Sequence, residues 1–89
     1  HQRRSLLLLA SVCGQLEIVQ YLLGFQDDGW CHVNERDVYG STALILACYG
    51  GHASVVRVLL SHGADPNLAT NDGFSPLMAA ALFGNLSCI

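Results

Sequence analysis

The sequence predicts an all-α solenoid of stacked helix-turn-helix units joined by hairpin-like loops. Three observations lead to this fold class. One segment recurs at a period of 33 residues, apolar residues recur at helical spacing, and short polar runs rich in Gly, Asn and Asp separate the helical segments. Such a period is typical of arrays in which each unit buries its apolar face against its neighbours.

The repeat becomes visible when residues 40–51 are aligned with residues 73–84. Glycines coincide at both ends, and the offset is 33 positions throughout. An earlier copy at residues 5–23 has an offset of 37 positions, which places four extra residues in the loop near residues 25–30. The sequence therefore predicts a partial repeat at 1–36 that carries the insertion, a full repeat at 37–69 and a truncated repeat at 70–89.

The first helix of each unit is predicted from its start signals. Thr42 and Ser75 occupy N-cap positions, where a hydroxyl accepts hydrogen bonds from backbone N–H groups that lack a helical partner. Pro76 follows at the first helical position, where its fixed φ favours a helix and its missing N–H costs nothing. We expect these helices to run to about Tyr49 and Phe83. A glycine then ends the first helix of each copy: Gly14, Gly51 and Gly84.

A second helix is predicted within two or three residues of that glycine. Its apolar residues share one amphipathic stripe, which we predict to be the core: Val55, Val56, Leu59 and Leu60. Gly63 is a candidate for the left-handed position that ends this helix. The polar segments 65–67 and 71–73 then predict a hairpin-like loop between repeats.

Composition argues against two classes of function. The chain has four Arg, no Lys and seven acidic residues, so it lacks the basic surface that a nucleic acid requires. No apolar run approaches the roughly 18 residues of a membrane helix, and the first residues lack the features of a secretory signal. We therefore expect no nucleic-acid partner, no direct membrane insertion and an intracellular, cytoplasmic location.

The chain is apolar for its length, with 52% hydrophobic residues, 12% charged residues and a mean hydropathy of +0.39. This balance suggests unsatisfied apolar surface at one or both ends of the array. The four cysteines (Cys13, Cys31, Cys48 and Cys88) are widely spaced and form no C-x-x-C pair. We predict that they are free thiols.

These residues resemble the ankyrin repeat family, whose unit follows the pattern G-x-T-P-L-H-x-A-A-x-x-G-H-x-x-V-V-x-L-L-L-x-x-G-A-D-x-N. The resemblance covers nearly the whole chain and implies a concave binding surface for other proteins, made by hairpin tips and first helices. The full repeat matches at fourteen positions: Gly40, Thr42, Leu44, Ala47, Gly51, His52, Val55, Val56, Leu59, Leu60, Gly63, Ala64, Asp65 and Asn67.

The chain also departs from the family pattern. The usual His of the first helix is replaced in all three copies, by Leu8, Ile45 and Met78, so its usual hydrogen bond to the Thr hydroxyl is absent. Thr70 takes the place of the usual hairpin Asp, which Asp37 keeps. We therefore expect cohesion between repeats to depend more on apolar packing than in a typical array.

The resemblance places the partner-binding residues by position. They are Val38, Tyr39, Ser41, Tyr49 and Gly50 in the full repeat, and Asn71, Asp72, Phe74, Leu82 and Phe83 in the third copy. Four of them are aromatic and are expected outside the repeat core, where aromatic side chains often anchor interfaces. Alternatively, these rings cover apolar surface between adjacent repeats. The expanded loop from Phe25 to Trp30 is a second candidate contact, unless it folds back onto the preceding helix.

No catalytic, cofactor or metal site is predicted. His52 and Cys48 match structural positions of the family, and no His or Cys pair has the spacing of a tetrahedral zinc site. No serine or cysteine is placed with a base for nucleophilic catalysis. Asn67, with Leu59 eight positions and Asp65 two positions before it, resembles the asparagines that are hydroxylated in ankyrin repeats. The alternative is a hairpin asparagine used only for backbone hydrogen bonds.

The sequence therefore predicts a non-catalytic interaction module of a scaffold or adaptor. Its partners would be another protein or peptide and neighbouring ankyrin repeats of the same chain. Two alternatives remain open. The array could be the docking arm of a larger assembly, such as a ubiquitin-ligase receptor or an ion channel, or it could be a structural spacer.

Overall fold

The computed structural model describes residues 2–24 and 33–82. The predicted insertion at 25–30 and the end of the third repeat lie outside these ranges. Every regular element of the described residues is a helix: α1 (Gln2–Cys13), α2 (Leu16–Leu23), α3 (Ala43–Gly50), α4 (Ala53–Ser61) and α5 (Pro76–Leu82). The predicted all-α class is confirmed.

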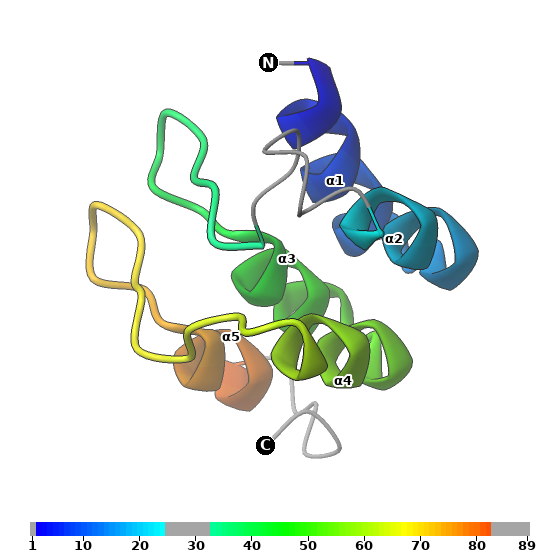
Figure 1. The fold of residues 1–89 in the computed structure, drawn as a ribbon. Coiled ribbons are helices and arrows are strands. Elements are labelled where there is room, and N and C mark those ends of the chain that lie inside the picture. The colour runs from blue at the N-terminus through cyan, green and yellow to red at the C-terminus, as the bar shows by residue number, and fades with distance from the viewer. Residues whose placement is uncertain (1, 25–32, 83–89) are drawn as a thin grey trace.

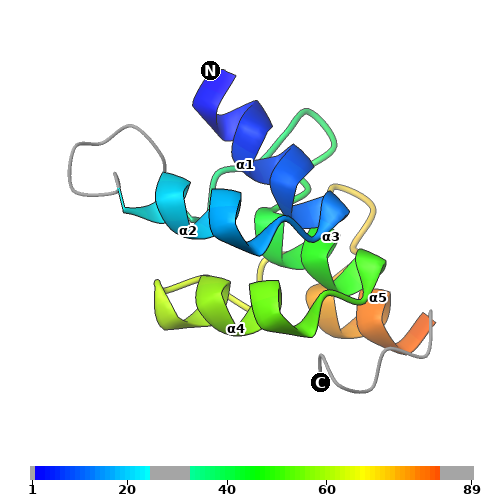
Figure 2. The same cartoon turned by 90° about the vertical axis from the view of Figure 1, so that its right-hand side faces the viewer.

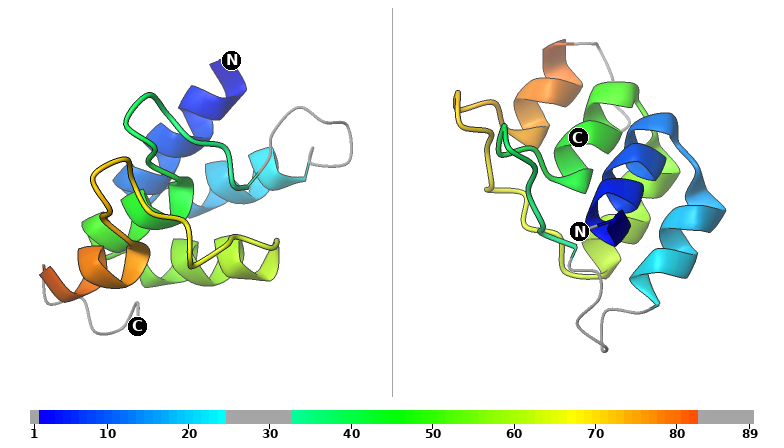
Figure 3. Two further views of the ribbon diagram at one scale, coloured as in Figure 1. Left: turned by 90° about the vertical axis from the view of Figure 1, so that its left-hand side faces the viewer. Right: turned by 90° about the horizontal axis from the view of Figure 1, so that it is seen from above.

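The helices form two rows, and the loops form a third layer. Helix α3 packs between α1 and α5, while α2 and α4 pack behind α1 and α3 and against each other (Figures 1 and 2). The loops that lead into α3 and α5 project together from the side opposite α2 and α4 and lie next to each other (Figure 3). The molecule is therefore a stack of helix pairs with hairpins along one side.

Both predicted N-caps are present. The Thr42 hydroxyl accepts a hydrogen bond from the Ile45 N–H at 3.2 Å, and the Ser75 hydroxyl accepts one from the Met78 N–H at 3.2 Å. Helix α5 begins at Pro76, as the sequence predicts. The first two helix pairs are each separated by a glycine with positive φ, Gly14 at 73° and Gly51 at 74°. These turns reverse the chain, so the second helix of each pair packs against the first.

The core lies between the two rows of helices. Its largest fully buried apolar side chains come from four helices: Leu7, Val19, Leu23, Leu44, Val55 and Leu59. The prediction that Leu60 belongs to this core is wrong, because Leu60 is 43% exposed. Leu23, which occupies the corresponding position one repeat earlier, is only 2% exposed because the next helix pair covers it. Burial at this position therefore depends on a following repeat.

Apolar side chains are also exposed on both sides of the stack. Leu77 and Met78 are 58% and 51% exposed, although the corresponding Leu44 and Ile45 are buried where α5 packs on α3. Leu6, Leu9 and Ile18 are similarly exposed on the first helix pair. The structure therefore carries the unsatisfied apolar surface that the composition suggests.

Adjacent repeats are joined by polar contacts as well as by apolar packing. The His52 ring hydrogen-bonds the Val12 carbonyl oxygen through Nε2 at 2.9 Å. The ring fits only because glycines surround it: a Cβ on Gly14 would lie 2.4 Å from His52 Nδ1, and one on Gly50 would lie 2.6 Å from its ring. Sequence analysis did not identify this inter-repeat hydrogen bond at the helical turns or the further ones between the hairpins. The expectation that cohesion depends more on apolar packing than in a typical array stays a prediction.

No helix within residues 2–24 and 33–82 is both long enough and apolar enough to cross a membrane.

Candidate partner-binding surface

The first hairpin is closed by the carboxylate of Asp37. Its Oδ1 accepts hydrogen bonds from the backbone N–H groups of Tyr39 at 2.9 Å and Ser41 at 2.8 Å. The Asp37 N–H donates to the Ser41 carbonyl at 3.0 Å, and the Gly40 N–H donates to the Asp37 carbonyl at 2.9 Å. The tip, Val38 and Tyr39, is therefore held by four hydrogen bonds within the loop.

The second hairpin has the same form with a different side chain. Thr70 replaces the aspartate, and its Oγ1 accepts a hydrogen bond from the Phe74 N–H at 3.0 Å. The Thr70 N–H donates to the Phe74 carbonyl at 2.9 Å, and the Gly73 N–H donates to the Thr70 carbonyl at 2.8 Å. The departure from the family pattern at Thr70 thus preserves the turn, because a hydroxyl can close it as a carboxylate does.

The two hairpin tips are bonded to each other through Asn71. Its backbone N–H donates to the Tyr39 carbonyl at 2.9 Å, and its side-chain Nδ2 donates to the Val38 carbonyl at 3.0 Å. The side chain of Arg36 bonds the same loops, donating to the carbonyls of Gly40 and Ala69. These contacts fix the tip of one hairpin relative to the next.

The predicted binding residues differ in exposure. Val38 is 84% exposed, Tyr39 is 72% exposed, and Tyr49 is 49% exposed on α3. Asn71, Asp72 and Gly50 are also exposed, and Ser41 is half-buried. Leu82 ends α5, whereas Phe83 and the loop from Phe25 to Trp30 lie outside the described residues. The surface thus presents one cluster at the hairpin tips and a separate tyrosine on α3.

Phe74 departs from the expectation of exposure. It is partly buried and packs against the core. Phe74 therefore fits, in part, the alternative prediction that the aromatic rings cover apolar surface of the stack.

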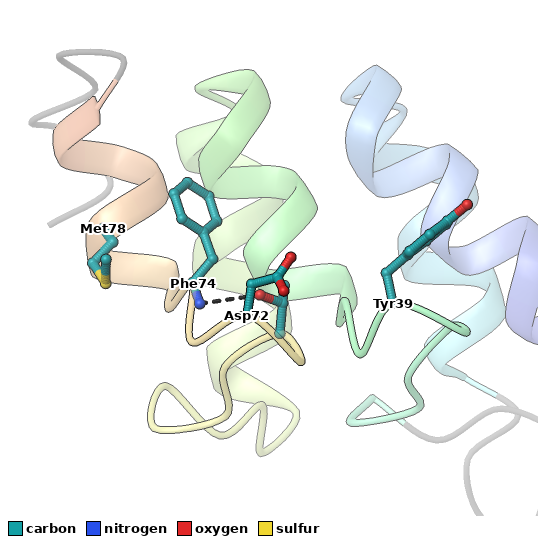
Figure 4. Close-up of a pocket in the computed structure, with 5 residues that line it drawn as sticks. Tyr39, Asp72, Phe74 and Met78 are labelled. Atoms are coloured by element: carbon teal, nitrogen blue, oxygen red, sulfur yellow. Dashed lines mark hydrogen bonds between the residues drawn. The ribbon is translucent and has the colours of Figure 1, made fainter.

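A hollow of about 410 Å³ lies between the two hairpins and the start of α5. Its lining residues are Tyr39, Thr70, Asp72, Phe74 and Met78. Figure 4 shows the Asp72 carboxylate between the two aromatic rings, with Met78 beyond Phe74 on α5. The sequence identified the two rings and Asp72 but missed Thr70 and Met78 as lining residues. Both residues depart from the repeat pattern of the family, and that departure was the sequence signal that could have identified them.

Comparison with known proteins identifies the fold. The sequence matches the family described as ankyrin repeats, in three copies, over residues 6–89. The chain belongs to the ankyrin repeat family. Ankyrin repeats generally act as protein–protein interaction modules and are generally non-catalytic.

Three relatives illustrate the breadth of proteins that carry similar ankyrin repeats. The ankyrin repeat and KH domain-containing protein mask-1 of Caenorhabditis elegans is 37% identical over 93% of this chain and 3% of its own length. Ankyrin repeat and SAM domain-containing protein 6 of Rattus norvegicus is 41% identical over 78% of this chain and 8% of its own. The BCL-6 corepressor-like protein 1 of Homo sapiens is 36% identical over 96% of this chain and 5% of its own length. The chain therefore spans a small part of the relatives that it matches.

Asn67, the predicted modification position, is exposed on the loop after α4. Its backbone N–H donates to Asp65 Oδ1 at 2.9 Å. Asn34, at the corresponding position one repeat earlier, donates to the Gly63 carbonyl at 3.3 Å and accepts from the Asp65 N–H at 2.7 Å. In this ankyrin stack the Asn34 side chain therefore hydrogen-bonds the loop of the next repeat. Asn34 thus has a structural role between repeats.

A second hollow of about 460 Å³ includes Asn67 and lies beside α3, α4 and α5. Its other lining residues are mostly apolar: Leu44, Cys48, Val56, Leu60, Pro66, Pro76 and Leu77. This hollow contains the exposed Leu60 and Leu77, so it belongs to the apolar side of the stack and is separate from the hairpin tips.

Metal-ligating residues form no cluster in the described part of this ankyrin stack. No group of three His, Cys, Asp or Glu side chains within residues 2–24 and 33–82 could hold a metal ion. Cys13 is an exposed free thiol and Cys48 a buried one, while Cys31 and Cys88 lie outside the described residues.

Proposed function

We propose that the chain is a non-catalytic interaction module that binds a partner protein or peptide through its concave face. This face comprises the hairpin tips and the first helices. The observation that carries the proposal is the exposure of Tyr39, 72%, at a tip whose backbone is held by Asp37 and by Asn71 of the next hairpin. An aromatic side chain that folding leaves largely in water is available to a partner.

The rigidity of the tips supports this proposal energetically. Binding costs free energy when loops and side chains become ordered, and a loop that is already ordered avoids part of that cost. Tyrosine adds a large apolar ring, a hydroxyl for hydrogen bonding and few rotatable bonds, which is why it is common among interface anchors. Val38 beside it is 84% exposed and extends the apolar contact.

The two apolar sides of the stack support a second part of the proposal. We infer that neighbouring ankyrin repeats of the same longer chain cover these apolar sides. We place the repeat boundaries between residues 36 and 37 and between residues 69 and 70. Leu60 and Leu77 in the apolar hollow would then be buried as Leu23 and Leu44 are in the described stack. The Asn67 side chain would bond the following loop as Asn34 does. We also propose that Asn67 is hydroxylated. Intact-mass analysis of protein expressed in cells tests this proposal, because hydroxylation adds the mass of one oxygen atom.

Cys13 and Cys48 form no disulfide among the described residues, which supports the proposed intracellular location, because reduced cysteines are typical of the cytosol.

The test compares two exposed tyrosines in an affinity-capture experiment with quantified partners. Tyr39→Ala removes the ring at the hairpin tip. Tyr21→Ala is the matched control, because Tyr21 is 69% exposed but lies on α2, in the row opposite the hairpins. We expect capture of a specific partner to fall at least tenfold for Tyr39→Ala, about 1.4 kcal/mol, and to stay unchanged for Tyr21→Ala.

Two outcomes contradict the proposal. Equal capture by the wild-type chain and Tyr39→Ala would place binding elsewhere. Absence of any partner that depends on the hairpin tips, in variants with the wild-type circular dichroism spectrum, would favour the spacer alternative.

A further inference from the structure

The hollow between the hairpins has a chemical character that the apolar hollow lacks. Its lining includes one carboxylate, on Asp72, together with the rings of Tyr39 and Phe74 and the thioether of Met78. The carboxylate lies between the two rings, and Met78 lies beyond Phe74 (Figure 4). Ring faces carry negative electrostatic potential and attract cations, and a carboxylate forms charge-assisted hydrogen bonds with cationic groups. The carboxylate and the two rings therefore favour a positively charged ligand over a neutral or negative one.

Asp72 differs from the other hairpin carboxylates in having no role in the fold. Asp37 Oδ1 accepts two backbone N–H groups, and Asp65 Oδ1 accepts one from Asn67. Asp72 is exposed and accepts no hydrogen bond from the described residues. Its position corresponds to Tyr39 one repeat earlier, at a tip where the loop closes without the side chain. The carboxylate is therefore available to a ligand.

Neither of the two arginines whose side chains the structure describes, Arg36 and Arg57, pairs with Asp72. Arg36, the arginine of the hairpins, donates its Nε to the Gly40 carbonyl at 3.1 Å and its Nη2 to the Ala69 carbonyl. Arg57 lies on α4, in the row behind the first helices. The net charge of −3 further favours a basic ligand.

We propose that this hollow binds the guanidinium group of an arginine side chain from a partner peptide, with Asp72 pairing the charge and the rings of Tyr39 and Phe74 on either side of it. This inference rests on the proposed function and names the partner's chemistry. A guanidinium suits the site better than an ammonium because it is planar, stacks on rings and is more weakly hydrated. Asn71 holds the hairpins together, so the groups are placed before the ligand arrives.

The experiment titrates the whole 89-residue chain with two blocked pentapeptides and follows ¹H–¹⁵N NMR spectra. One peptide has a single arginine between alanines. The other has citrulline at that position, which keeps the shape and removes the charge. We expect saturable shifts at Tyr39, Asp72 and Phe74 with the arginine peptide, and affinity about tenfold lower for the citrulline peptide.

Two variants test the role of the carboxylate at constant shape. Asp72→Asn should weaken binding of the arginine peptide about tenfold. Glu17→Gln changes the net charge equally, but Glu17 is exposed on α2, and we expect it to bind as the wild type does. Both variants should fold, since neither carboxylate accepts a hydrogen bond from the described residues.

Three results would overturn the inference: equal affinity for the citrulline peptide, wild-type affinity in Asp72→Asn, or shifts confined to residues away from the hollow. Failure here is distinguishable from failure of the proposed function. A protein partner that requires Tyr39 but binds Asp72→Asn at wild-type affinity would leave the interaction surface in place and refute only the arginine site.

Discussion

Replacing Gly40 with alanine should destabilise the protein more than the same change at Gly73. Both glycines end a hairpin tip with positive φ, 80° for Gly40 and 84° for Gly73. They differ in their surroundings. A Cβ on Gly40 would lie 2.6 Å from Asn71 Oδ1 and 2.9 Å from Asn71 N, whereas a Cβ on Gly73 would have no atom within 4 Å. The pair therefore separates backbone strain from the contact between hairpins.

The magnitude follows from these two terms. A left-handed conformation costs a residue with a Cβ about 1–2 kcal/mol, and this cost applies equally to both variants. At Gly40 the methyl group also displaces Asn71, which donates to the Tyr39 and Val38 carbonyls at 2.9 and 3.0 Å. Two hydrogen bonds at about 0.5–1.5 kcal/mol each add about 1–3 kcal/mol. We expect Gly40→Ala to cost about 2–5 kcal/mol and Gly73→Ala about 1–2.

Urea denaturation followed by circular dichroism measures the difference. With a slope of about 1–2 kcal/mol per molar urea, the two variants should differ in midpoint by about 1 M. Equal losses of stability would refute the argument that the neighbouring hairpin, rather than the turn itself, requires glycine at position 40. A Gly73→Ala loss larger than that of Gly40→Ala would refute it as well.

Three further predictions, which use five alanine substitutions, test the packing, capping and inter-repeat contacts of the stack by the same denaturation assay. Leu59→Ala should cost about 2–5 kcal/mol, because Leu59 is 0% exposed, while Leu60→Ala should cost under about 1 kcal/mol at 43% exposure; similar losses would contradict the burial difference. Ser11→Ala should be neutral or stabilising by up to about 1 kcal/mol, since the buried Ser11 hydroxyl has no hydrogen-bond partner among the described residues, whereas Thr42→Ala should cost about 1–2 kcal/mol by removing a cap; the opposite order would be inconsistent with these contacts. His52→Ala should cost about 1–2 kcal/mol by removing its 2.9 Å bond to the preceding repeat, and a loss below about 0.5 kcal/mol would argue against that link.

The elements of the fold were predictable because their signals are local. A hydroxyl at Thr42 or Ser75 caps the turn that follows it, and Gly51 reverses the chain at its own position. Such features act within a few residues of the sequence position that encodes them. The period of 33 then places each element relative to the next copy, so the order of helices follows from the sequence alone.

Burial of individual side chains was less predictable because it depends on the neighbouring repeat. Leu59 and Leu60 belong to one apolar stripe, yet their exposures are 0% and 43%. Helical spacing shows that both lie toward the stack, but it does not show which of them a neighbour covers. Phe74 illustrates the same limit at the hairpins, because its position suggests exposure while its ring partly packs against the core.

The candidate site was predictable in position and less so in chemistry. Family resemblance placed Tyr39 and Asp72 at hairpin tips, where they are exposed. The resemblance did not show that Tyr39 and Asp72 line one hollow. These residues lie 33 positions apart in the sequence, and their tips lie next to each other because Asn71 bonds one tip to the other.

On the proposed function, fold stability and binding geometry would depend on the same contact between hairpins. The hydrogen bonds of Asn71 join the tip that carries Tyr39 to the tip that carries Asp72. We therefore expect Asn71 to affect recognition without contacting the partner. If both roles hold, Asn71→Ala should weaken arginine binding even though the groups proposed to touch the guanidinium are unchanged. Asp72→Asn should weaken binding with little loss of stability, because its carboxylate supports no part of the described fold.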